Sequence, residues 1–172
     1  VWGMARTWRA LSLAGGPAAL VRSGAWPAWR TPGGFGRALL LATGVGMLAG
    51  GLVITGVGMT AVFVPQDLRF MGLTAAELNA INPRLIPLIA HDRAGFGGGV
   101  GTCGLIWCVC VWCGRPTRSL WQALLLAGGI GFAGAIGVHP VIGYTDFLHL
   151  LPAYAGASMC VAGLWLTRPG RL

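Results

Sequence analysis

The chain has 172 residues, of which 55% are hydrophobic and only 9% are charged. A soluble domain carries about 25% charged residues, so this composition excludes a soluble globular protein and indicates an integral membrane protein. The formal net charge is +8, from twelve basic residues, all of them arginine, and four acids.

The first 37 residues are a basic arm that contains five arginines, four tryptophans and no acid. We expect this arm to lie on the membrane surface, because each arginine adds about 1 kcal/mol of attraction to anionic lipid. Docking on a protein partner is the alternative. The charged region is too long for a signal peptide. No basic and aromatic module typical of nucleic-acid binding is recognisable, so we expect no nucleic-acid partner.

Residues 38–172 are predicted to form an all-α integral membrane domain, a bundle of four transmembrane helices. Each apolar segment approaches the roughly 20 residues that cross about 30 Å of hydrocarbon. The outer loop, residues 65–93, is predicted to carry a short interfacial helix at 75–81. Thr74 and Glu77 have the spacing of a capping box at its start, and Pro83 follows its end. The four segments are 38–64, 94–113, 120–138 and 147–166.

Charge placement predicts the orientation of the bundle. Nine arginines flank one side, whereas three arginines and all four acids flank the other, so the two sides carry +9 and −1, which add to +8. By the positive-inside rule both termini are expected to be cytoplasmic. Trp112, Trp121 and Trp165 fall near the same helix ends, as interfacial tryptophans should. The nine arginines are Arg6, Arg9, Arg22, Arg30, Arg37, Arg115, Arg118, Arg168 and Arg171.

Two long motifs stand out in the sequence: NPRLIPLIAHDRAGFGG, residues 82–98, and GYTDFLHLLPAY, residues 143–154, the second preceded by IGVH at 136–139. They resemble an uncharacterised family of small bacterial integral membrane proteins. The resemblance covers about residues 64–166 and implies a multi-pass protein of the bacterial inner (cytoplasmic) membrane. Such segments sometimes occur beside dihydroorotate-dehydrogenase-like domains. Nothing of a flavin domain is present in this sequence, so the resemblance implies no dehydrogenase chemistry here.

Seven polar side chains are expected at the outer ends of the helices, at one level of the membrane. Ionisable groups near a bilayer cost free energy unless they are paired or hydrated, which makes them candidates for function. These residues are therefore candidates for an outer-face site that would bind a ligand, a quinone or a lipid headgroup. Its residues are His91, Asp92, Arg93, His139, Tyr144, Asp146 and His149.

A structural role for these residues is the alternative interpretation. Asp92 and Asp146 stand where they could cap helix N-termini, and Arg93 could pair with either carboxylate. A metal site of His139, His149 and Asp146 has suitable ligand types. Its spacing matches no recognised metal motif, so we predict neither a metal ligand nor a catalytic residue.

Cysteine and glycine are interpreted mainly as packing residues. Cys110 and Cys113 have redox spacing, but they lie in an apolar helix, where small apolar packing is expected. Small residues four apart let helix backbones approach each other in lipid. Small residues beyond those needed for packing within the bundle could also dock another subunit, or a bound lipid, quinone or pigment at the helix surface. The expected packing positions are Gly46, Gly50, Gly97, Gly101, Gly129, Ala133 and Gly137.

The leading functional prediction is a non-catalytic accessory or structural subunit of a larger membrane protein complex, of an energy-transducing kind (photosynthetic or respiratory). Small size, glycine-rich helix faces and the lack of a recognisable catalytic set support it. The alternative is a small membrane enzyme, or a quinone- or lipid-binding redox partner, that uses the outer His/Asp/Arg site. A transporter ranks third, because no inverted repeat is visible.

Overall fold

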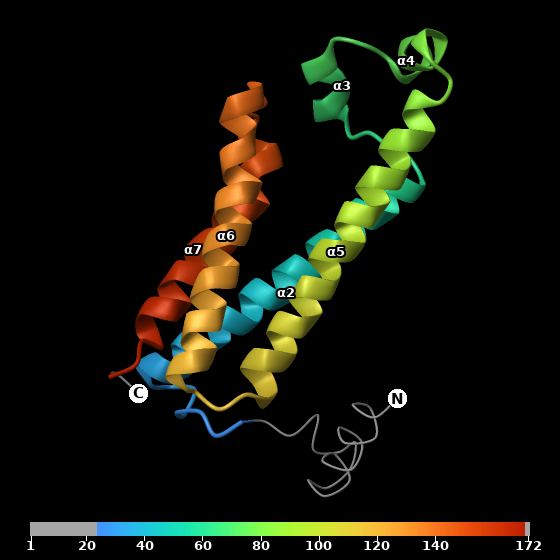
Figure 1. The fold of residues 1–172 in the computed structure, drawn as a ribbon. Helices are drawn as coiled ribbons and strands as arrows, with labels where there is room; N and C mark the ends of the chain where they lie inside the picture. Colours follow the sequence, from blue (N-terminus) through green and yellow to red (C-terminus); the bar gives the residue numbers. More distant parts are fainter. Residues whose placement is uncertain (1–23, 171–172) are drawn as a thin grey trace, which may run out of the picture.

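The structure is a computed structural model that describes residues 24–170. Four long helices run side by side, and two short helices connect the first of them to the second (Figure 1). The long helices are long and apolar enough to cross a membrane, which agrees with the predicted all-α membrane class. The elements are α2 (Pro32–Met59), α3 (Pro65–Met71), α4 (Ala75–Ile81), α5 (Leu85–Cys113), α6 (Arg118–Ile142) and α7 (Phe147–Leu166).

The first spanning helix is shifted toward the N-terminus relative to the predicted segment 38–64. α2 begins at Pro32 because the hydroxyl of Thr31 accepts a hydrogen bond from the Gly34 amide at 3.1 Å. Proline suits this first position, since its missing N–H would have no partner there. The helix ends at Met59, before a turn in which Val62 has a φ of 62°.

The second spanning helix differs most from its predicted range, 94–113. α5 begins at Leu85 and includes Pro87, which lies in the first turn, where a backbone N–H is not needed. His91, Asp92 and Arg93 therefore lie within the helix and not in the loop before it. Asp92 cannot be the N-cap that the sequence suggested, because two helical turns precede it.

The other helices follow the end signals in the sequence. α6 is longer than the predicted 120–138, since Thr117 caps its start and Gly143, at a φ of 77°, follows its end. α4 and α7 have the predicted bounds. In α4 the Thr74 amide donates to the Glu77 carboxylate at 2.7 Å, and the Glu77 amide donates to the Thr74 hydroxyl at 3.2 Å. α3 was not predicted.

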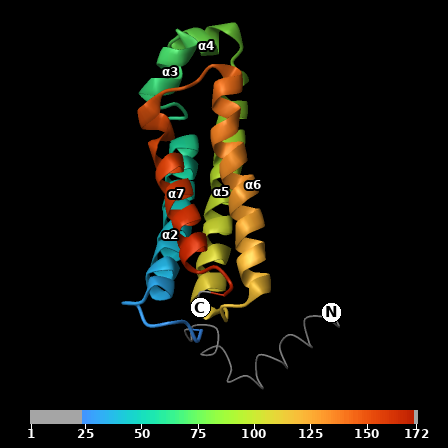
Figure 2. The same cartoon turned by 90° about the vertical axis from the view of Figure 1, so that its left-hand side faces the viewer.

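The bundle has two chemically distinct ends. The arginine-rich end contains the start of α2, the end of α5, the start of α6 and the end of α7, whereas the loop end contains α3 and α4 (Figure 2). Residues 24 and 170 lie at the arginine-rich end, as four crossings require. The side of the membrane that this end faces stays a prediction from charge. Residues 1–23 of the arm lie outside the described residues. All four acids belong to the loop end: Asp67, Glu77, Asp92 and Asp146.

α2 and α5 touch backbone to backbone through glycine. A Cβ atom at Gly51 would collide with the Gly101 backbone, and one at Gly97 would lie 2.5 Å from the Thr55 nitrogen. Gly44, Gly51 and Gly58 form the contact stripe of α2, because seven residues are almost two helical turns. Close approach of this kind supplies the dispersion contacts that hold helices together in lipid.

The predicted packing glycines are therefore used in α5 but not in α2 or α6. Gly97 and Gly101 lie in the α2–α5 contact. On α2, Gly46 lies about 200° around the helix axis from Gly44 and faces away from α5. Ala133 on α6 is exposed. Four predicted positions have open space where a Cβ would stand: Gly46, Gly50, Gly129 and Gly137.

An apolar core joins all four spanning helices in the half nearest the arginine-rich end. The indole N–H of Trp107 on α5 donates to the Leu40 carbonyl on α2, and that of Trp121 on α6 donates to the Leu164 carbonyl on α7, both at 2.8 Å. Toward the loop end the α2–α5 pair and the α6–α7 pair diverge (Figure 1). The buried core residues are Leu40, Trp107, Val111, Leu124, Cys160 and Leu164.

Arg37 is a buried cation at the arginine-rich end, with only 3% of its surface exposed. Its guanidinium donates to the carbonyls of Val111 (3.4 Å) and Trp112 (2.8 Å) at the end of α5. The rings of Trp26, Trp29 and Trp112 surround it at 5.4, 4.8 and 5.0 Å. A helix C-terminus and aromatic faces both favour a cation. These contacts hold residues 24–31 of the arm against α5 of the same chain.

The α2–α5 contact predicts opposite effects for two adjacent substitutions. Gly51→Ala should lower the free energy of unfolding by about 1–3 kcal/mol, the usual cost of overpacking, because the methyl group meets the α5 backbone. Gly50→Ala, where the methyl group meets open space, should leave stability unchanged or slightly higher. Thermal unfolding of both variants in the same detergent measures the difference. Equal midpoints for the two variants would contradict the close contact.

Candidate functional site

Asp67 is the centre of a polar cluster at the loop end, and its side chain is 8% exposed. One carboxylate oxygen, Oδ2, lies 2.8 Å from Nη2 of Arg93 on α5 and accepts the Val64 amide at 3.0 Å. The other, Oδ1, accepts the hydroxyl of Tyr144 at 2.9 Å. The carboxylate on α3 therefore connects α5 to the turn between α6 and α7.

Tyr144 is held among three further rings. Phe70 on α3 stacks on it with ring centroids 4.7 Å apart, while His149 and His139 lie at 4.6 and 5.9 Å. The Tyr144 oxygen is 3.4 Å from Nδ1 of His149. Because the hydroxyl hydrogen points to Asp67, the tautomer of His149 with a proton on Nδ1 donates to the Tyr144 oxygen. Asp67, Tyr144 and His149 then form one chain of hydrogen bonds.

The cluster changes the proton affinity of its two members that lie outside the spanning helices. Burial raises the pKa of Asp67, but hydrogen bonds from Val64, Arg93 and Tyr144 outweigh burial and set that pKa below its ordinary value. Burial and the hydrogen bond to the Asp67 carboxylate raise the pKa of Tyr144 to about 12. At neutral pH the cluster contains a carboxylate and a neutral phenol.

Among the described side chains, His139 has a buried ring nitrogen, Nδ1, without a hydrogen-bond partner. Its ring centroid is 5.4 Å from that of His149. A buried polar atom left unpaired costs about 1–3 kcal/mol, so this nitrogen is a natural point of attachment for a polar atom of a ligand.

The structure brings together four of the seven predicted site residues and separates three. The cluster around Asp67 contains Arg93, His139, Tyr144 and His149. Arg93 pairs with Asp67, and not with Asp92 or Asp146 as the sequence suggested. Asp146 caps α7 by accepting the His149 amide at 2.8 Å, as the structural alternative predicted. The remaining two, His91 and Asp92, pair with each other on the exposed surface of α5 at 3.0 Å.

Asp67 is the functional candidate that the sequence analysis missed. The signal was present: Val64 precedes a proline and stands three residues before the acid, the spacing of a helix start with an acidic third residue. A short helix at Pro65 would have placed Asp67 at the level of Arg93 and Tyr144. Because residues 65–71 were predicted as loop, the proximity of Asp67 to Arg93 and Tyr144 was not predicted.

Neither metal binding nor thiol chemistry is indicated in the described part of the chain. Residues 24–170 contain no group of three His, Cys, Asp or Glu side chains placed to hold a metal ion. The five cysteines form no disulfide in the described structure; Cys103 is exposed, Cys160 lies in the core, and Cys108, Cys110 and Cys113 are intermediate in exposure. The cluster can bind and orient polar atoms through its hydroxyl, carboxylate, guanidinium and imidazole groups.

Comparison of the chain with protein-family models, with curated proteins and with solved structures finds no match. The resemblance of residues 82–98 and 143–154 to a bacterial membrane family therefore stays a prediction.

Titration of Tyr144 tests the cluster directly. In a Tyr154→Phe background Tyr144 is the one remaining tyrosine, and it should ionise near pH 12, well above the ordinary value of about 10. Because its pKa is raised by folding, its contribution to stability is present below about pH 10 and is lost as the pH rises through about 12. Asp67→Asn should move the pKa back toward 10. Ultraviolet absorbance of the tyrosinate measures both values, and an unchanged pKa in Asp67→Asn would contradict the hydrogen bond.

Proposed function

We propose that this chain is a non-catalytic subunit of a larger membrane protein complex, which it joins mainly through the uncovered face of α6. We also propose that it resides in the bacterial inner membrane with its arginine-rich end in the cytoplasm, on the strength of the charge difference between the two ends.

The observation that carries this proposal is the exposure of α6. Leu124 and Gly128 are its only buried residues in the described structure, both in its first half. Beyond them the helix has glycines with open space beside them, at 129, 131, 134 and 137. Ile130 is 74% exposed and Val141 83% exposed.

Open glycines in a spanning helix need an explanation. Glycine costs about 1 kcal/mol relative to alanine in a soluble helix, and in lipid its benefit is the close approach of another backbone. α2 and α5 use glycine in this way against each other, at Gly51 and Gly101. The four open glycines of α6 have no such contact within the described chain, so a helix of another subunit is the partner that would use them.

Extraction from native membranes in mild detergent, followed by native gel electrophoresis and mass spectrometry, tests this proposal. The wild-type chain should migrate with larger companion chains. Gly129→Leu combined with Gly137→Leu should release it to the size of a monomer without lowering its thermal midpoint, because both positions are open within the chain. Val138→Leu with Val141→Leu, two exposed positions on α6, is the matched control and should stay assembled. A wild-type chain that migrates alone would overturn the proposal.

A second candidate function is favoured by the unpartnered nitrogen of His139. In this proposal the loop-end cluster binds a small polar ligand of the quinone type, whose carbonyl oxygen accepts a hydrogen bond from the imidazole. The same extraction distinguishes the two candidates. A chain that migrates alone with a bound quinone, lost in His139→Phe, would favour the ligand site over the subunit role.

A further inference from the structure

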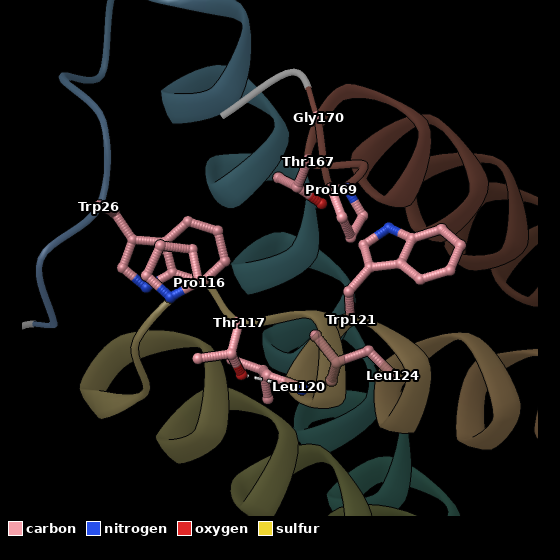
Figure 3. A pocket seen from close by; sticks show the side chains of 9 residues that line it. All are labelled: Trp26, Pro116, Thr117, Leu120, Trp121, Leu124, Thr167, Pro169 and Gly170. Atoms are coloured by element: carbon pink, nitrogen blue, oxygen red, sulfur yellow. Dashed lines mark hydrogen bonds between the residues drawn. The ribbon is translucent and has the colours of Figure 1, made fainter.

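We propose that the arginine-rich end binds one anionic phospholipid of the surrounding bilayer. Its glycerol and upper acyl chain would occupy the cavity of Figure 3, and its phosphate would lie among Arg115, Arg118 and Arg168.

The cavity lies between the arm, the turn from α5 to α6, the start of α6 and the segment after α7, and has a volume of about 210 Å³. Trp26 and Trp121 stand on opposite sides of it, with Leu120 and Leu124 beside them (Figure 3). The site is thus built from three separate parts of the chain, around residues 26, 116–124 and 167–170, and is formed only in the folded bundle.

The wall of the cavity has both polar and apolar surface, and several of its polar side-chain groups already have partners within the chain. The indole N–H of Trp26 donates to the Gly114 carbonyl at 2.8 Å, and that of Trp121 donates to Leu164. The hydroxyl of Thr167 donates to Gly163 at 2.8 Å. A lining of this mixed kind suits the junction of a phospholipid, where the polar glycerol meets the upper acyl chain.

The rim of the cavity is positively charged. Arg115, Arg118 and Arg168 are exposed, and each directly adjoins a lining residue in the sequence: Pro116, Thr117 or Thr167. All four acids lie at the loop end, so no acidic side chain is available to these arginines. The phosphodiester of an anionic lipid would supply negative charge at this rim, and it suits a guanidinium well.

The size of the cavity agrees with a lipid. Pockets that enclose a whole small molecule usually measure about 300–1,000 Å³, more than this one. A phospholipid needs only partial enclosure, since its headgroup stays in the interface and the rest of its chains in the bilayer. The tryptophans here lie at a helix end, the position of an interfacial belt.

Native mass spectrometry of the full chain in detergent tests the proposal, with dioleoylphosphatidylglycerol and dioleoylphosphatidylcholine as the probes. The chain should retain one molecule of the anionic lipid at concentrations where the zwitterionic lipid dissociates. Arg118→Gln with Arg168→Gln should weaken retention about 10- to 30-fold, from about 1 kcal/mol for each arginine. Leu120→Trp, which fills the cavity, should weaken it as well.

Arg69→Gln with Arg84→Gln is the matched control, because it removes the same charge from exposed positions at the loop end. This control should retain the lipid like the wild type. Equal losses in the two double variants would reduce the effect to diffuse attraction and overturn the proposal. Equal retention of both lipids would also overturn it. Displacement of the lipid by millimolar inorganic phosphate would show a site for free anions instead.

Discussion

The carboxylate of Asp67 joins parts of the chain that the hydrophobic core does not hold together. The α2–α5 and α6–α7 pairs share a core only in the half near the arginine-rich end, and they diverge beyond it (Figure 1). At the loop end, Arg93 of one pair and Tyr144 of the other both bind this carboxylate. Removing one partner of a buried ion pair leaves an uncompensated charge, at a cost of about 3–5 kcal/mol. The position of the α6–α7 turn, and with it that of His139 and His149, therefore depends on Asp67.

The two ends of the bundle accommodate buried charge in different ways. At the loop end a carboxylate is paired with an arginine and a phenol. At the arginine-rich end, where the chain has no acid, Arg37 is held by the terminal carbonyls of α5 and by three tryptophan rings. Dipoles and aromatic faces are enough to bury one cation, but they leave the exposed arginines without a counter-ion. That difference favours an anionic lipid at the arginine-rich end, in line with the site proposed there.

Composition and local signals were enough to predict which segments form helices. They were not enough to predict which face of each helix contacts its neighbours. Four apolar segments and the Thr74–Glu77 capping box were enough to predict the spanning helices and the short helix α4. The contact stripe of α2 was not predicted, because Gly44, Gly51 and Gly58 are seven apart, whereas the usual small-residue packing motif has residues four apart. The site was predicted in part because His139, Tyr144 and His149 are near one another in the chain. Asp67 comes from a distant helix, so only the fold brings it to them.

The distance between the two helix pairs at the loop end tests this account most directly. Spin labels at Leu88 on α5 and Val141 on α6, both exposed, would report that distance by pulsed electron resonance in a cysteine-free background. The account predicts a single narrow distribution in the wild type, and a longer and broader one in Asp67→Asn. Labels at Val109 and Ser119, near the arginine-rich end, should give the same distribution in both proteins. An unchanged distance between Leu88 and Val141 in Asp67→Asn would contradict the role of Asp67 as the link between the two pairs.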